Sequence, residues 1–380
     1  MQKKIIALAI AGVVSGAAFA QTNVTVYGVV DQGYLYAKSD AASSNPEGDN
    51  KFSGLKDGGL NGTRIGFKGE EALGNGLKAI FTQEYGKAAD MNGDSWATRQ
   101  AFVGLAGTWG SFTLGRQYNA ASHAVGRNNA NDVTSVNPYN VIQGQFGSQI
   151  RSMGGNARQD NVVKYMSPNW SGFSFIGTYS FGESTNGTSG ASAGYNQYNL
   201  TDVTDNGRYS LLGSYANGPF NIDVAYALTD SVRTTYPVAT PDLQGKDIAE
   251  WYIGGAYDFK VVKLYAHYQE LQNDNKATSV ITDMKQYSIS LGVPVAAKGR
   301  FMVEYTVLDA EYGNTAGNTD GKTDGWGVAY WHDLSKRTRL YAGISQIDYD
   351  KNLPALTGDA QVMAPGEKAT HYNFGIRHAF

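Results

Sequence analysis

The segment HYNFGIRHAF, residues 371–380, alternates between two kinds of side chain. One register is aromatic or aliphatic apart from a single histidine: Tyr372, Phe374, Ile376, His378 and Phe380. The residues between them are small or polar. Such a period of two is typical of a β-strand whose two faces meet different surroundings. The segment therefore predicts a strand that is apolar on one side and polar on the other.

The same alternation continues through the rest of the chain in stretches of similar length. Sixteen segments follow this pattern: 24–36, 63–71, 77–86, 96–107, 111–118, 160–167, 172–181, 208–216, 220–228, 248–259, 262–271, 284–293, 299–308, 324–334, 338–349 and 369–380. Most are longer than the five or six residues that are usual for a strand. We therefore expect an all-β protein built from antiparallel strands.

The connections between these segments are of two kinds. Seven are short turns, and Asn75-Gly76 in one of them suits a two-residue hairpin loop. The other eight are longer, polar and rich in Gly, Asn and Asp: 37–62, 87–95, 119–159, 182–207, 229–247, 272–283, 309–323 and 350–368. This order predicts hairpins standing side by side, with both chain termini at the short-turn end.

The composition limits the class of protein. Charged residues make up 17% of the 380, below the usual quarter, while aromatic residues reach 12%. Cysteine is absent, so no disulfide holds the chain. The formal net charge is −3, which gives no sign of a nucleic-acid partner. No H-E-x-x-H motif occurs, and none of the five histidines lies in a catalytic motif, so no metal, cofactor or nucleophilic enzyme site is predicted.

The N-terminus has the three parts of a secretory signal peptide. MQKK is basic, IIALAIAGVV is apolar, and Ala18-Phe19-Ala20 is a small-x-small cleavage site. A short membrane anchor is the alternative, but the apolar run is brief and lacks charge on its far side. We expect residues 1–20 to be removed on export and residues 21–380 to form one domain.

The strands of a soluble β-sandwich would show the same alternation of apolar and polar residues as those of a membrane barrel. Ten residues rising ~3.4 Å each and tilted by ~45° span roughly 24 Å, close to the ~25 Å apolar band of an outer-membrane barrel. A closed barrel also pairs every backbone group in hydrocarbon, because it has no edge. Bulky aromatic residues near the short turns predict a girdle at the membrane surface: Trp109, Trp170, Trp331 and Phe380. We therefore predict a 16-stranded antiparallel transmembrane β-barrel.

Several motifs resemble those of a known family, the trimeric sixteen-stranded general-diffusion porins of Gram-negative beta-proteobacteria. The motifs are VTVYGVVDQGY (24–34), SGLKDGGLNGTRIGFKGEEALGNGLKAIFTQE (53–84), TRQAFVGL (98–105), SFTLGRQY (111–118), NVVKY (161–165) and RHAF (377–380). The resemblance implies an outer-membrane homotrimer surrounded by lipid and lipopolysaccharide. It also implies that the third loop, 119–159, folds into the barrel and narrows the channel.

The resemblance further implies a ladder of arginines facing that loop. The matching residues are Arg64, Arg99 and Arg158, with Arg116 as a fourth candidate. Arg64 lies on the polar register, opposite Ile65 and Phe67, but Arg99 and Arg116 share parity with apolar neighbours, as a subunit contact or a β-bulge would allow. The full predicted constriction is Arg64, Arg99, Arg116, Arg158, Glu84, Asp132, Arg127 and Arg151, with Lys68 and Lys78 elsewhere in the lumen.

Arginine exceeds acid in this set, and a ring of positive charge favours anions. We therefore expect passive diffusion of small hydrophilic solutes and ions, with mild anion selectivity. Three alternatives remain: a substrate-specific channel to which Tyr34, Tyr139 and Tyr265 could contribute, an outer-membrane enzyme, and a purely structural anchoring protein.

Overall fold

The computed structural model describes most of the mature chain. The described residues are 23–39, 51–86, 96–145, 158–181, 207–232, 246–273, 281–314, 317–352, 356–358, 361–363 and 368–380. The predicted signal peptide, 1–20, lies outside these ranges.

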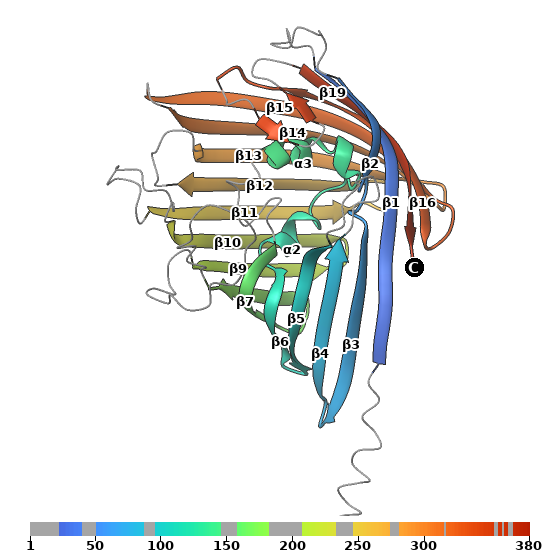
Figure 1. Ribbon diagram of the computed structural model, residues 1–380, viewed down its shortest axis with the longest axis vertical. Coiled ribbons are helices and arrows are strands. Elements are labelled where there is room, and N and C mark those ends of the chain that lie inside the picture. The colour runs from blue at the N-terminus through green and yellow to red at the C-terminus, as the bar shows by residue number, and fades with distance from the viewer. Residues whose placement is uncertain are drawn as a thin grey trace, which may run out of the picture.

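The described chain is mostly β-strand, and the strands follow one another in chain order around one antiparallel sheet (Figure 1). The strands are β1 (Asn23–Ser39), β2 (Lys51–Asp57), β3 (Arg64–Gly74), β4 (Leu77–Gly86), β5 (Ala97–Gly107), β6 (Gly110–Tyr118), β7 (Arg158–Met166), β8 (Phe173–Ser180), β9 (Arg208–Asn217), β10 (Phe220–Val232), β11 (Lys246–Asp258), β12 (Lys263–Asn273), β13 (Ile281–Val295), β14 (Gly299–Asn314), β15 (Gly317–Asp333), β16 (Thr338–Asp348) and β19 (Lys368–Ala379). A separate hairpin joins β17 (Leu356–Gly358) to β18 (Gln361–Met363).

The sheet closes because β1 pairs on both of its edges. One edge pairs with β19, from Val29 opposite Ala379 onward. The other pairs with β3 over its first half and with β2 over its second half, so β2 and β3 occupy one position around the ring. The 17 strands of this sheet therefore make a barrel of sixteen positions, as predicted. Phe380 completes the closure through backbone hydrogen bonds with Gly28 in both directions.

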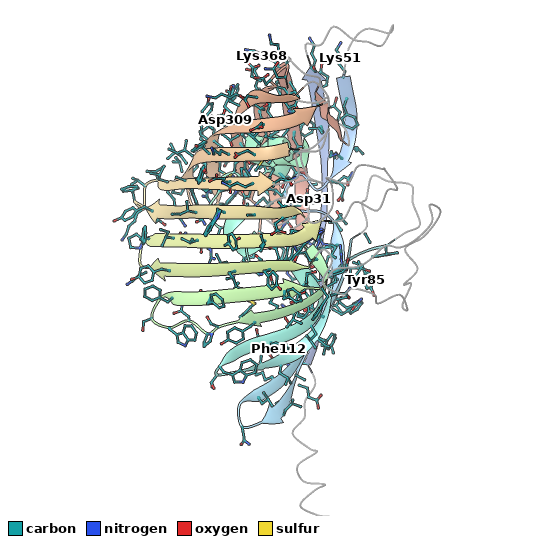
Figure 2. All side chains as sticks on the ribbon, turned by 90° about the vertical axis from the view of Figure 1, so that its left-hand side faces the viewer. Asp31, Lys51, Tyr85, Phe112, Asp309 and Lys368 are labelled. Carbon is teal, nitrogen blue, oxygen red and sulfur yellow. The ribbon has the colours of Figure 1, made fainter. Side chains whose placement is uncertain are left out.

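The two faces of the strands differ as the sequence predicts. In β19, Tyr372, Phe374 and Ile376 are 46%, 59% and 47% exposed, whereas His371 and Asn373 are fully buried. Similar rows of exposed apolar residues continue around the other strands, and Figure 2 shows Phe112 of β6 at the barrel surface. The outer face is therefore apolar and the inner face largely polar.

The short turns confirm the predicted pattern of connections. Asn75 and Gly76 alone link β3 to β4, with φ of 51° and 77°. Two successive residues with positive φ are what a type I′ hairpin turn requires, and Asn-Gly is the pair that adopts them most readily. At the opposite end, Lys51 of β2 and Lys368 of β19 flank β1 (Figure 2).

The long connections depart from the prediction in three places. The segment 309–323 was expected to be a loop, but β14 continues to Asn314 and β15 begins at Gly317, and these two residues are cross-strand partners. The segments 37–62 and 350–368 contain β2 and the β17–β18 hairpin. These strands lie in stretches without an apolar register. Backbone pairing can extend a hairpin into water without apolar alternation, so the sequence carries no signal for it.

The described part of the third loop, residues 119–145, contains three short helices and lies inside the barrel. They are α2 (Ser122–Val125), the 3₁₀ helix η2 (Thr134–Val136) and α3 (Pro138–Gln145). Figure 1 draws α2 and α3 within the outline of the strands, and their buried residues pack against inward side chains of the wall. In the described part of the chain, no helix is long and apolar enough to cross a membrane.

The outward face of β6 provides a test of this arrangement. Leu114 is 47% exposed on that face, whereas Ser111 of the same strand lies on the inward register. We predict that Leu114→Arg lowers the free energy of unfolding in lipid vesicles by about 2–4 kcal/mol, because it places a charge in hydrocarbon. Ser111→Arg is the control and is expected to change it by less than about 1 kcal/mol. The free energies of unfolding are measured by denaturant titration. An equal loss of stability in the two variants would contradict the assignment of Leu114 to the outward face and Ser111 to the inward face.

Candidate pore constriction

A carboxylate and two arginines form the centre of the predicted ladder. The Glu84 side chain lies on the inward register of β4 and is 6% exposed. Its Oε1 accepts a hydrogen bond from Arg99 Nε at 2.8 Å, and its Oε2 lies 3.7 Å from Arg64 Nε. Tyr27 of β1 donates its hydroxyl to the same Oε2 at 3.1 Å. One negative charge thus orients two positive ones.

A β-bulge explains why Arg99 joins this cluster although its sequence parity is apolar. Gln100 lies opposite Glu84 and Thr98 lies opposite Tyr85, which leaves Arg99 without a partner in the ladder. An extra residue of this kind interrupts the alternation and re-aims a side chain. The bulge therefore brings Arg99 to the face of Glu84.

Arg158 extends the cluster across β7 through a tyrosine. Its Nη1 donates to the Tyr118 hydroxyl at 3.2 Å, and its guanidinium lies 5.3 Å from the centre of that ring. Arg99 Nη2 approaches the same hydroxyl at 3.4 Å. Arg64, Arg99 and Arg158 consequently form one continuous inward group.

The structure does not place Arg116 in this group, so that part of the prediction is wrong. Arg116 lies on the register of Phe112 and Leu114, which are 41% and 47% exposed. It pairs with Asp160, itself half exposed, at 2.6 Å, and donates to the Thr98 carbonyl. The parity that Arg116 shares with Phe112 and Leu114 correctly indicates the outward face, because the shift in the β6–β7 register comes only after Gly115.

Two further arginines extend the positive surface and were missed at the sequence level. Arg377 of β19 lies opposite Asp31 on one side and opposite Arg339 of β16 on the other. It interacts electrostatically with Arg64 as well as with Arg339. Both follow the inward register, and Arg377 belongs to the polar face of the final segment. Parity alone could have identified it.

Only some of these arginines form ion pairs with the surrounding acids. Asp333 accepts two hydrogen bonds from Arg339, at 2.7 and 3.2 Å, and Asp132 of the third loop lies 3.6 Å from it. In the described ranges, no carboxylate lies within 4.0 Å of Arg158 or Arg377. On the inward surface that runs from β7 through β5, β3, β1 and β19 to β16, five arginines thus face four nearby acids, Glu84, Asp31, Asp333 and Asp132. We call Arg158, Arg99, Arg64, Arg377 and Arg339 the arginine belt.

The third loop is fixed to the opposite wall by charged and amide side chains. Arg127 donates to Asp223 of β10 at 2.8 Å and to Ser214 at 3.1 Å, while Asn128 donates to the other Asp223 oxygen at 2.7 Å. Asp223 is 1% exposed, so its charge is fully engaged there. Arg127 is thus an anchor as well as a loop cation. Arg151, also predicted at the constriction, lies outside the described residues.

Farther along the loop, Asn129 donates to Glu304 of β14 at 2.7 Å and Tyr139 donates to Gln269 of β12 at 2.7 Å. Near its start, His123 lies 2.7 Å from Lys164 Nζ. Burial, together with Lys164 and Arg127, lowers the pKa of His123 to about 3. His123 is therefore neutral at physiological pH and adds no charge to the lumen.

An inward bend of the wall supports the loop from the other side. The segment between β2 and β3 turns at Gly58, where φ is +79°. Asp31 Oδ2 accepts the backbone N–H groups of Leu60 and Asn61, and Tyr341 donates to Asp31 Oδ1 at 2.7 Å. Leu60 then packs with Val133 and Val136 of the loop. Sequence reasoning did not identify Asp31, because its partners are distant in the chain.

The predicted lumen lysines lie on the same inward register, nearer the short turns. Lys68 lies over the Tyr27 ring at 5.5 Å, and Lys78 pairs with Glu70 at 2.9 Å. Among the predicted girdle residues, Trp109, Trp170 and Phe380 are 42%, 55% and 45% exposed at the short-turn end.

The girdle prediction is wrong for Trp331. Its indole N–H donates to Asp132 at 3.2 Å, and the Arg339 guanidinium lies 3.5 Å above its ring. It packs against the inward cluster that contains Met302 and Tyr341. Its neighbour Tyr330 pairs with the exposed Phe301 and occupies the outward register instead. Closeness to a short turn predicts the position of Trp331 along the barrel axis, but it does not predict whether the side chain points inward or outward.

The geometry describes a barrel with a polar interior narrowed between an internal loop and a belt of arginines. A sequence model of the family described as Gram-negative porin matches residues 7–352. The chain belongs to this family.

Individual porins agree over the full length of the chain. An outer membrane porin protein of Bordetella pertussis is 31% identical over 419 aligned positions, which cover 100% of both chains. The anion-selective porin from Comamonas acidovorans is 25% identical, with a TM-score of 0.74 over 95% of this chain and 100% of its own. OmpT of Vibrio cholerae in its trimer form shares the fold, with 15% identity and a TM-score of 0.63 over 94% of this chain and 99% of its own. This porin is accordingly an outer-membrane protein.

The loop anchor at Asp223 provides the second test. We predict that Asp223→Asn speeds amide hydrogen exchange in residues 124–133 by about tenfold, because Arg127 loses a charge-assisted hydrogen bond worth about 1.5 kcal/mol. Exchange in the strands should not change. Asp160→Asn, which breaks the outward pair with Arg116, is the matched control and should leave the loop unchanged. Unaltered loop exchange in Asp223→Asn would show that the loop is held elsewhere.

Proposed function

We propose that this porin is a water-filled channel for passive diffusion of small hydrophilic solutes, with a mild preference for anions. The observation that carries the proposal is the arginine belt, whose five cations line one inward surface opposite the third loop. Arginine keeps its charge at any physiological pH and stays weakly hydrated, so it can replace part of an anion's water shell. No bond is made or broken in such passage.

The preference is mild because nearby acids offset much of the belt. Glu84 and Asp333 each hold at least one belt arginine, and Asp132 approaches Arg339 as well. In bulk water a unit charge attracts an ion 4 Å away by only about 1 kcal/mol. The residual field therefore biases the entry of ions without trapping them. The porin from Comamonas acidovorans, which is described as anion-selective and is 25% identical to this chain, supports a preference for anions.

A substrate-specific channel and an outer-membrane enzyme are less well supported. A substrate-specific track would need aromatic side chains along the lumen, but Tyr34 packs on Phe374 at the exposed face, and Tyr139 of the loop is buried against the wall, where it donates to Gln269. Only Tyr265 of the three suggested tyrosines lines an inner recess. For an enzyme, no group of three metal-binding side chains occurs within the described ranges. Since the relatives are channels, we propose that this chain has no catalytic role.

The belt can be tested by measuring the reversal potential across a bilayer in a potassium chloride gradient. We predict anion preference in the native channel and, in Arg64→Gln/Arg158→Gln, a fall of about twofold or more in the chloride-to-potassium permeability ratio. Loss of two fixed positive charges weakens the field that favours chloride.

Two matched variants sharpen this result. Arg116→Gln removes an arginine from the outward face and should leave the ratio unchanged. Glu84→Gln removes the acid that offsets Arg64 and Arg99 and should raise it. Cation preference in the native channel, or an equal effect of Arg116→Gln, would refute the proposal.

We further propose that three copies assemble in the outer membrane, among lipid and lipopolysaccharide, after cleavage before Gln21. The trimer form of OmpT, which shares only the fold, and the apolar outer face support this assembly. Light scattering of the detergent-solubilised porin, corrected for bound detergent, should give the mass of three mature chains. A single-chain mass under conditions that preserve conductance would contradict it.

A further inference from the structure

A basic recess lies in the barrel wall at its short-turn mouth, next to the Arg339 end of the arginine belt. It has a volume of about 390 Å³ and is formed by the ends of β11 to β15. Its cations are Lys260, Lys263, Lys298 and Arg300, and its acids are Asp258 and Asp333. The volume accommodates a small organic or inorganic anion together with water.

The two acids of the recess are already engaged by other groups. Asp258 Oδ1 accepts the backbone N–H of Lys260 at 2.7 Å, which holds the β11–β12 turn. Asp333 is bound by Arg339 through two hydrogen bonds. Neither acid lies within 4.0 Å of a cationic group of the four recess cations, and none of these cations forms an ion pair with any described residue. Four positive charges therefore surround the space without a direct counter-charge.

Arg300 and Lys263 are held in place by an aromatic ring rather than by an acid. The Arg300 guanidinium donates to the Tyr265 hydroxyl at 2.6 Å and lies 5.5 Å from the ring centre. Lys263 Nζ lies 5.0 Å from the same centre. Gly292 leaves the space that the guanidinium occupies, because a Cβ there would collide with it. A cation positioned by a neutral ring keeps its full charge available for a ligand.

The recess also lies next to the third loop. Tyr265 is 5% exposed and packs with Ala130 of that loop, whose backbone N–H donates to Ser290 of β13. Trp331, which contacts Asp132 of the loop, forms another side of the recess. An ion that has passed the loop toward the short-turn side therefore meets these cations next.

We propose that this recess is a binding site for a compact dianion, of the phosphate or short dicarboxylate class, that the ion occupies before leaving the channel. Two negative charges on adjacent oxygens match the guanidinium of Arg300 and the ammonium of Lys263, which both lie next to the Tyr265 ring. A monovalent chloride ion gains from only one of them at a time. The inference rests on the proposed anion passage and adds a discrete site to it.

The test measures how inorganic phosphate, added to the short-turn side at pH 8, inhibits the single-channel chloride conductance. In the native channel, phosphate should inhibit at millimolar concentration and should be less effective from the other side. Lys263→Gln/Arg300→Gln should raise the half-inhibiting concentration at least about tenfold, since two charge-assisted contacts are lost.

The matched control is Lys336→Gln/Arg337→Gln, which removes the same two charges from the neighbouring β15–β16 turn, outside the recess. It should change the half-inhibiting concentration by less than about twofold, since these charges face water at the mouth. An equal shift in both double variants would show that only general mouth charge acts, and would overturn the site. Lys298→Gln, in an exposed turn that cannot disturb folding, should give a smaller increase of about threefold.

Malonate serves as the second probe. Inhibition by phosphate alone or by both dianions supports the site and distinguishes the two ligand classes, whereas inhibition by neither overturns it. The reversal potential is recorded on the same channels. Anion preference without dianion inhibition refutes the recess alone, and cation preference refutes the proposed function together with it.

Discussion

The structure depends on one constraint: inside a bilayer, every backbone N–H and C=O group needs a partner within the protein. A sheet satisfies this only when its two edges meet. Here the edges meet at β1, which pairs with β19 on one side and with β2 and β3 on the other. The hydrogen bonds between Gly28 and Phe380 are the last of this seam. The apolar segment with which the sequence analysis began therefore lies in the closing strand, β19.

Closure gives the two faces of each strand different environments, and this difference determines which side chains line the lumen. Apolar residues cover the outside, so polar side chains gather inside, where water and the third loop share the space. Apolar packing against the wall and hydrogen bonds to Asp223, Glu304 and Gln269 together hold the loop. With the loop held against the wall in this way, we propose that the arginine belt biases which ions pass. The basic recess continues the same positive surface toward the short-turn mouth.

The strands and their faces could be predicted from the sequence because both follow from a period of two. All sixteen segments correspond to strands, and Arg64 and Glu84 lie on the face that parity assigns. Prediction failed where the period is interrupted or absent. Arg99 reaches the lumen through a bulge, and strand pairing continues over 309–314 and 317–323 without apolar alternation. Trp331 was assigned to the aromatic girdle because it is close to a short turn. That closeness predicts its position along the barrel axis but not whether its side chain points outward. Asp31 and Tyr341 are 310 residues apart, so no local pattern connects them.

The opposite environments of adjacent residues can be measured directly, since the chain has no cysteine of its own. Phe67 and Lys68 are neighbours in β3, the first on the outward face and the second on the inward face. In native membranes, a charged thiol reagent should label Lys68→Cys and spare Phe67→Cys, while a lipid-soluble reagent should label Phe67→Cys. Labelling of both by the charged reagent would contradict an oily exterior around a water-filled interior.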